Sequence, residues 1–221
     1  MSDVEVCQLA YEGKLGELKY KTIDDRSLFT KVDQCGRVPL HWAASGGRNE
    51  VEEFLLQQNV DVDPRDASDW TPLMIAASAG GQQIVADLIG HGASVNVINS
   101  TGQTPLHYTS SKDRYDLTEL LLQNGANPNI GDQVGNTPLH RSASKGNIKI
   151  TKLLLSYNAD TYYQDTEGNT PLHLACEEGR PQDAKLLVDH GASMTVRNKD
   201  EKSPLELAAP GLRRQLQTIS T

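Results

Sequence analysis

Four histidines are the side chains best suited to chemistry, since imidazole binds metals and transfers protons near neutral pH. They follow Pro-Leu at one recurring position, 33 or 66 residues apart: His41, His107, His140 and His173. A metal site needs converging ligands, and a catalytic base needs a nucleophile and an orienting group nearby. Equivalent residues of successive repeats do not converge. We therefore expect each ring to bond to the turn of its own or the next repeat.

The other reactive residues complete no site either. The chain has three cysteines without Cys-x-x-Cys spacing, which predicts neither a disulfide framework nor a zinc site: Cys7, Cys35 and Cys176. Such thiols are typical of a reducing, intracellular compartment. No set of nucleophile, base and orienting group can be named. The sequence predicts a protein that is not an enzyme and has no metal and no cofactor.

These residues recur because the sequence repeats with a strict period. Six prolines, three of them within Thr-Pro-Leu-His and the others within variants of that phrase, are each 33 residues apart: Pro39, Pro72, Pro105, Pro138, Pro171 and Pro204. This period, with a turn and two helical patterns per repeat, is typical of ankyrin repeats. We predict an all-α repeat solenoid of seven ankyrin repeats. Each repeat is a helix-turn-helix with a β-hairpin-like turn, and residues 1–221 form a single elongated domain.

The period also gives the repeat boundaries. Residues 1–32 lack the phrase but keep two helical patterns, which indicates an N-terminal capping repeat. The internal repeats are 33–65, 66–98, 99–131, 132–164 and 165–197, and residues 198–221 form the C-terminal cap.

Turn and cap residues recur with the period. Each turn opens with Asp or Asn, and Thr or Ser caps the first helix. Val38 stands at the Thr position and cannot cap. Asp69 and Glu201 replace a turn glycine, and Asp113 replaces the glycine that ends a first helix. The second helices end at Gly or Asn, the residues that tolerate a left-handed cap.

Composition excludes some partners. A net charge of -8 and a pI near 5.2 argue against nucleic acid, which is bound by clustered Lys and Arg. The sequence contains no long apolar run and no secretory leader, so we expect neither a membrane span nor export. We expect a monomer in the cytoplasm and nucleus.

Binding should use positions where repeats differ on a common scaffold. Turn tips and first helices of an ankyrin array line a concave groove, and Trp, Tyr and Arg dominate interface energetics. The acidic first repeats suit a basic partner, while Trp42 and Tyr108 are equally compatible with packing between repeats. The candidates for partner binding are Arg37, Trp42, Asp66, Asp69, Trp70, Gln103, Tyr108, Lys112, Asn136, Arg141, Lys145, Glu177 and Glu178.

Three longer segments of the sequence resemble one particular family of ankyrin-repeat proteins. The opening Val6 to Leu15, the phrase Leu40-His41-Trp42-Ala43 and the stretch from Gln164 to Cys176 resemble the gankyrin-type ankyrin-repeat family of 26S proteasome non-ATPase regulatory subunits. The resemblance implies an assembly chaperone of the regulatory particle that grips the C-terminal domain of a proteasomal AAA ATPase subunit. The family's groove arginine and lysine fall on Arg37 and Lys112. We expect both to be replaceable at little cost in stability.

The same resemblance implies a cyclin-dependent kinase and a retinoblastoma-type protein as further partners, the latter through Leu-x-Cys-x-Glu. Leu174, Cys176 and Glu178 match that pattern. Leu174 is a core position of a first helix, so docking as an extended peptide would require local unfolding, and we favour a structural role. An ankyrin inhibitor or adaptor of a cell-cycle kinase or transcription regulator remains the alternative function.

Overall fold

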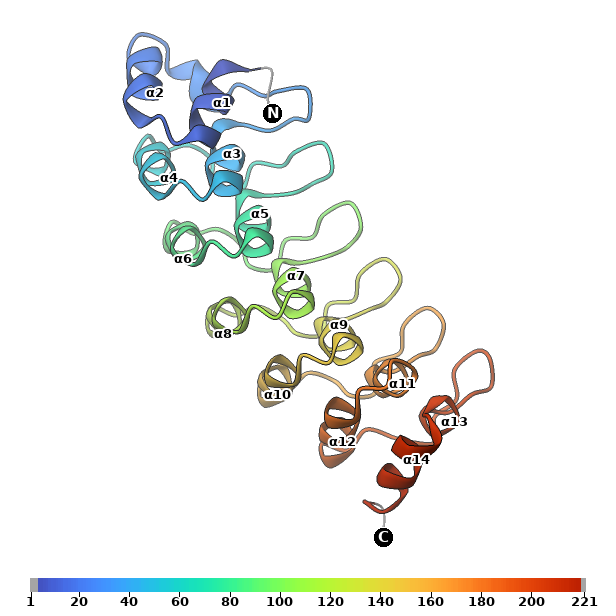
Figure 1. The fold of residues 1–221 in the computed structure, drawn as a ribbon. Helices are drawn as coiled ribbons and strands as arrows, with labels where there is room; N and C mark the ends of the chain where they lie inside the picture. Colours follow the sequence, from blue (N-terminus) through green and yellow to red (C-terminus); the bar gives the residue numbers. More distant parts are fainter. Residues whose placement is uncertain (1–3, 220–221) are drawn as a thin grey trace. The chain divides into compact units, whose positions relative to one another are not determined.

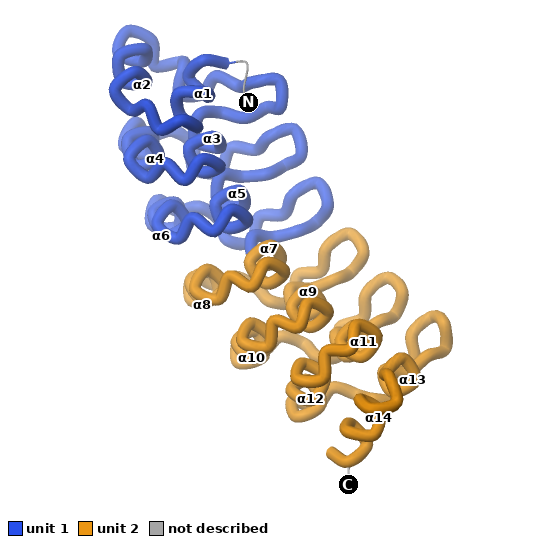
Figure 2. Tube along the Cα trace, in the orientation of Figure 1, with its two compact units in different colours: residues 1–105 blue, residues 106–221 orange. Residues whose placement is uncertain are grey.

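The computed structural model describes residues 4–219. Its contacts group the chain into two compact units, unit 1 (Met1–Pro105) and unit 2 (Leu106–Thr221) (Figure 2). Within the described residues every regular element is a helix, and the fold class is the predicted all-α repeat solenoid. No described helix is long and apolar enough to span a membrane.

Unit 1 contains three pairs of helices and the start of α7 (Figure 1). The helices are α1 (Glu5–Glu12), α2 (Leu15–Thr22), α3 (Pro39–Gly46), α4 (Asn49–Leu56), α5 (Pro72–Ala79) and α6 (Gln82–Gly90). First helices pack on first helices, as α1 on α3 and α3 on α5, while α4 packs on α6. A short 3-10 helix, η1 (Arg26–Thr30), was not predicted. Asp25 caps it by accepting from the Ser27 N–H at 3.0 Å.

Unit 2 repeats the arrangement. Its helices are α7 (Pro105–Ser111), α8 (Tyr115–Gln123), α9 (Pro138–Lys145), α10 (Ile148–Ser156), α11 (Pro171–Glu177), α12 (Pro181–Asp189), α13 (Pro204–Leu207) and α14 (Pro210–Gln217). Within this unit α9, α11 and α13 pack in series, and so do α8, α10, α12 and α14. Buried apolar side chains pack these layers together, among them Leu121, Ile150 and Leu154.

Helix ends follow the predicted cap chemistry. Thr71 and Thr137 accept bonds from the N–H groups of Met74 and His140, whereas Val38 makes no side-chain cap. Second helices are followed by left-handed residues, including Asn59 at φ 56° and Asn158 at φ 59°. Asp69, Asp113 and Glu201 take the same conformation as the glycines they replace, at φ 60°, 55° and 58°. The period therefore fixes backbone conformation even where glycine is absent.

Candidate partner-binding surface

The hairpins are held by one repeated device. The side chain of each opening Asp or Asn accepts two backbone N–H bonds from its own turn, as Asp33 Oδ1 does from Cys35 and Arg37, both at 2.9 Å. The same pair of bonds forms at Asp66, Asn99, Asp132, Asp165 and Asn198. The second donor is always the tip residue, which stands directly before the helix-capping position. The backbone of each tip is therefore fixed while its side chain varies: Arg37, Trp70, Gln103, Asn136, Asn169 and Lys202.

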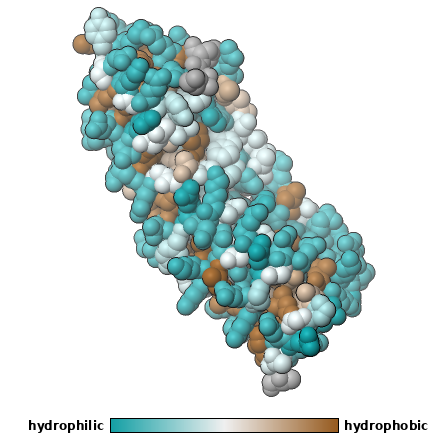
Figure 3. Space-filling model, viewed as in Figure 1, coloured by the Kyte–Doolittle hydropathy of each residue, from teal (hydrophilic) through white to brown (hydrophobic). Residues whose placement is uncertain are grey.

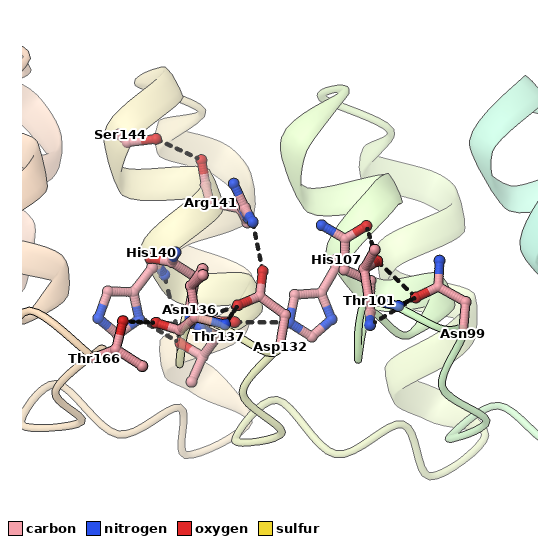
Figure 4. Close-up of polar contacts among 12 residues, drawn as sticks. Asn99, Thr101, His107, Asp132, Asn136, Thr137, His140, Arg141, Ser144 and Thr166 are labelled. Atoms are coloured by element: carbon pink, nitrogen blue, oxygen red, sulfur yellow. Dashed lines mark hydrogen bonds and ion pairs between the residues drawn. The ribbon is translucent and has the colours of Figure 1, made fainter. Parts of the chain in front are cut away.

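The four recurring histidines join their first helices to the next tip. His140 Nδ1 accepts from the Thr137 N–H at 3.1 Å (Figure 4). Its Nε2 bonds to the carbonyl of Asn169 at 3.0 Å. His41, His107 and His173 bond in the same way to the carbonyls of Trp70, Asn136 and Lys202. The prediction that these rings bond to turns is confirmed.

Burial keeps these rings neutral. It lowers the pKa of His107 to about 4, although the bond to the Asn136 carbonyl and the nearby Asp132 oppose that shift. The pKa values of His41, His140 and His173 are lowered for the same main reason. With Nε2–H donating to a carbonyl and Nδ1 accepting from an N–H, neither nitrogen of His140 is left to bind a metal.

The second oxygen of the turn acid has a different partner from repeat to repeat. Asp33 Oδ2 accepts from Trp42 Nε1 at 2.9 Å, and Asp132 Oδ2 pairs with the Arg141 guanidinium. Trp42 and Arg141 occupy the same position of their first helices, nine residues after the turn acid. Each side chain therefore ties its own helix to its own hairpin.

In unit 1 these bonds form a cluster of Tyr11, Asp33, Arg37, Trp42 and Asp66, here called the Trp42 cluster. The Arg37 guanidinium lies over the Trp42 ring at 5.5 Å, and the edge of Tyr11 meets that ring at 5.7 Å between centroids. Arg37 Nε also donates to Asp66 Oδ2 at 2.9 Å. Arg37 is thus a link between neighbouring hairpins as well as a surface residue.

The pairing of Arg37 with Asp66 bears on one expectation. The Asp66 side chain is 4% exposed and that of Arg37 27% exposed, so the pair is largely buried. Burial alone would raise the pKa of Asp66, but hydrogen bonds from Arg37 and from the N–H groups of Trp70 and Ser68 outweigh it and lower that pKa. Replacing Arg37 should therefore cost more stability than the sequence alone led us to expect, because its loss leaves a buried carboxylate without its counter-ion.

Unit 2 presents a different surface at the ends of its first helices. Lys112 directly follows α7, Lys145 ends α9 and Glu178 follows α11, so one repeat position carries Lys, Lys and Glu in succession. All three residues are exposed, and so is Glu177. Unit 1 has Gly46 and Ala79 at the equivalent position.

The remaining candidates contribute less exposed surface. Trp70, Gln103, Tyr108, Asn136 and Arg141 are partly exposed. Asp69 directly precedes the tip residue Trp70, and its Oδ1 lies 3.7 Å from Arg65 Nη1. Within each unit, we call the tips together with the exposed ends of the first helices its tip surface.

Two of the three residues of the Leu-x-Cys-x-Glu pattern lie inside α11. Leu174 is partly buried and Cys176 is 1% exposed, while Glu178 is exposed. Burial raises the pKa of the Cys176 thiol to about 12, so it remains protonated at neutral pH. Cys7 is also buried, Cys35 is exposed, and all three cysteines are free.

Sequence analysis missed the acids that receive Trp42 and Arg141. The signal was present, because both residues stand nine positions after a turn aspartate and both can donate a hydrogen bond. Tyr11, which packs on Trp42 from the N-terminal capping repeat, carried no such signal.

Comparison with known families fits this geometry. A model of ankyrin repeats in three copies matches residues 10–99, 40–132, 81–165, 106–198 and 158–212. The chain belongs to the ankyrin-repeat family. Ankyrin-repeat hairpins and helix pairs thus account for the repeated bonds described above.

Curated relatives are similar over part of the chain. The 26S proteasome non-ATPase regulatory subunit 10 of Mus musculus is 52% identical over 71 residues, which is 32% of this chain and 31% of that protein. The human subunit of the same name is 53% identical over 71 residues, with the same coverage. The probable 26S proteasome regulatory subunit p28 of Saccharomyces cerevisiae is 36% identical over 74 residues, 32% of each chain. The matches thus span less than a third of the relatives' length, and they confirm the resemblance to proteasome regulatory subunits.

Proposed function

We propose that this ankyrin-repeat protein is a non-enzymatic assembly chaperone of the 26S proteasome regulatory particle. In this proposal its tip surface binds the C-terminal domain of one AAA ATPase subunit of the base. The observation that carries the proposal is the 52% identity to a 26S proteasome regulatory subunit over 71 residues.

The tip surface supports a binding role. Every hairpin has the same bonds from its opening Asp or Asn, so the tips are rigid, while the tip side chains differ from repeat to repeat. A rigid surface loses little conformational entropy on binding, which favours affinity. Lys112 and Lys145 add two exposed positive charges at equivalent positions of adjacent repeats, which suits carboxylates on a partner.

A pull-down from cell extract tests the partner. The full chain, the double variant Lys112→Glu/Lys145→Glu and the control Lys185→Glu are immobilised at equal amounts. Lys185 is an exposed lysine of α12, outside the tip surface. We expect the wild type and the control to retain a base ATPase subunit, and the double variant to lose it.

Other outcomes would change the proposal. Recovery of a cyclin-dependent kinase or a retinoblastoma-type protein without any ATPase subunit would favour the inhibitor or adaptor function. As part of the proposal we place the protein in cytoplasm and nucleus, and fractionation of cells expressing the tagged chain would check this.

A further inference from the structure

A surface pocket of about 580 Å³ lies between α8 and α10 in unit 2, on the second helices and therefore outside the tip surface. This volume falls within the roughly 300 to 1,000 Å³ of ligand sites in proteins. The pocket is lined by Tyr115, Asp116, Lys149, Lys152, Leu153 and Ser156.

The lining is amphipathic. Leu153 is buried and Tyr115 is 37% exposed, so together they offer an apolar base. Lys149 and Lys152, one helical turn apart on α10, are exposed and have no ion-pair or hydrogen-bond partner among residues 4–219. With Asp116 as the one acid, the pocket carries a local positive charge in a chain of net charge -8.

The pocket's chemistry comes from these side chains and not from the repeat scaffold. In unit 1 the positions 66 residues earlier on α4 and α6 carry Asn49, Glu50, Gln83, Ala86 and Asp87, with Gly90 in place of Ser156. Those positions include two acids and no lysine. A basic pocket therefore distinguishes α8 and α10 from the equivalent helices of unit 1.

We propose that this pocket docks a segment of a partner protein in which an apolar side chain is flanked by carboxylates. The apolar side chain packs on Tyr115 and Leu153, and the flanking carboxylates pair with Lys149 and Lys152. Asp116 accepts a backbone N–H of the segment. Five of the six lining residues are exposed, so the pocket covers one side of its ligand only.

A segment anchored by the rest of a protein suits this shape better than a free small molecule does, because a small-molecule site encloses most of its ligand. An extended apolar partner suits it less, since apolar side chains on the face drawn in Figure 3 form small patches between hydrophilic ones. The site is distinct from the tip surface, so its occupant could bind together with the proposed ATPase domain.

An NMR titration of the full chain tests the proposal. The probe is the blocked pentapeptide Glu-Glu-Leu-Glu-Glu, and the matched control peptide is Gln-Gln-Leu-Gln-Gln. We expect saturable amide shifts around Tyr115 and Lys152 with the acidic peptide, with a Kd on the order of 1 mM that weakens with added salt. The Gln peptide should bind roughly tenfold more weakly or not at all.

Variants distinguish binding of the acidic peptide in the pocket from its attraction to any exposed lysine. The double variant Lys149→Glu/Lys152→Glu should weaken binding roughly tenfold or more with unchanged Tm. Lys185→Glu changes the lysine that occupies the position of Lys152 one repeat later, and it should leave binding unchanged. Absence of saturable shifts, equal binding of the two peptides, or an equal loss with Lys185→Glu would each overturn the proposal.

Discussion

Units 1 and 2 are built from the same repeat but treat one buried position differently. In unit 1 this position is occupied by Glu52, whose side chain is 0% exposed. Neither of its carboxylate oxygens has a hydrogen-bond partner among the described residues. The equivalent Thr151 of unit 2 is also buried, but it donates to Asp183 Oδ1 at 2.6 Å and bonds to Ser142. Both units therefore bury a polar side chain at this position, but only Thr151 of unit 2 has hydrogen-bond partners for it.

Glu52 in unit 1 and His107 in unit 2 should make opposite contributions to the pH dependence of stability. Burial raises the pKa of Glu52 to about 8, with smaller contributions from the negative charges of Asp87 and Glu53. An acid whose pKa is raised on folding contributes stability below its unfolded pKa, and this is lost as pH rises toward the folded value. The buried His107 of unit 2 has its pKa lowered to about 4, so stability is lost as pH falls.

The largest effect is expected in the Trp42 cluster. Arg37→Glu should destabilise unit 1 by about 3 kcal/mol, the low end for breaking a buried ion pair, since it sets a second negative charge against Asp66. Urea unfolding followed by tryptophan fluorescence measures this, because both tryptophans, Trp42 and Trp70, lie in unit 1. Lys145→Glu in unit 2 is the control and should change stability by less than about 0.5 kcal/mol. Equal effects of the two reversals would contradict the structural role of Arg37.

A smaller effect should follow from removing Glu52. Between about pH 5.5 and pH 7 the raised pKa of Glu52 should contribute a loss of about 2 kcal/mol to the stability of unit 1, since one pKa unit corresponds to about 1.36 kcal/mol. Glu52→Val, which introduces the residue found at the equivalent Val85, should remove this decline. The same fluorescence measurement at both pH values checks it. Glu53, the exposed neighbour of Glu52, provides the control, because Glu53→Gln should leave the loss of stability between the two pH values in place.

His107 in unit 2 should contribute the reverse dependence. From about pH 7 to pH 5.5, protonation of the unfolded chain at His107 should cost about 1 kcal/mol of stability. His107→Met, which copies Met74 at the equivalent position of unit 1, should remove that share of the loss even though its hydrogen bonds disappear. Hydrogen exchange of peptides from α7 and α9, measured by mass spectrometry, reports it. An unchanged pH slope would show that His107 is not held neutral by the fold.

The smallest effect concerns a hairpin tip. Asp69 holds φ 60°, where unit 2 has Gly135 at φ 78°. Asp69→Gly should stabilise unit 1 by roughly 0.5 kcal/mol, because glycine adopts a left-handed conformation without strain. The reverse change, Gly135→Asp, should destabilise unit 2 more strongly. An added Cβ there would lie 2.9 Å from the Cα of Asp165 in the next hairpin. Thermal melts of both variants that moved in the same direction would contradict this.

The sequence predicted the backbone better than the side-chain pairs. The period and the cap residues located the helix pairs and the left-handed positions at Asn59, Asp113 and Asn158, because these depend on local conformation. The bond from Arg37 to Asp66 spans 29 residues, and a period alone does not choose among the donors that could reach a turn acid. Glu52 could have been found, since its repeat position is otherwise filled by Val85, Thr118, Thr151 and Ala184.

The basic residues of the two units have different roles. Arg37 holds two hairpins together in unit 1, whereas Lys112 and Lys145 are exposed at the ends of first helices in unit 2. Reversing the two lysines should therefore affect binding and spare folding.

Isothermal titration of the chain with a purified C-terminal domain of a base ATPase subunit tests this most directly. For Lys112→Glu/Lys145→Glu we expect the affinity to fall by roughly thirtyfold or more, because charge-assisted contacts are lost, and the free energy of unfolding to stay within about 0.5 kcal/mol of the wild type. Unchanged affinity for the double variant, with the wild type binding, would contradict the claim that the tip surface of unit 2 contacts the ATPase.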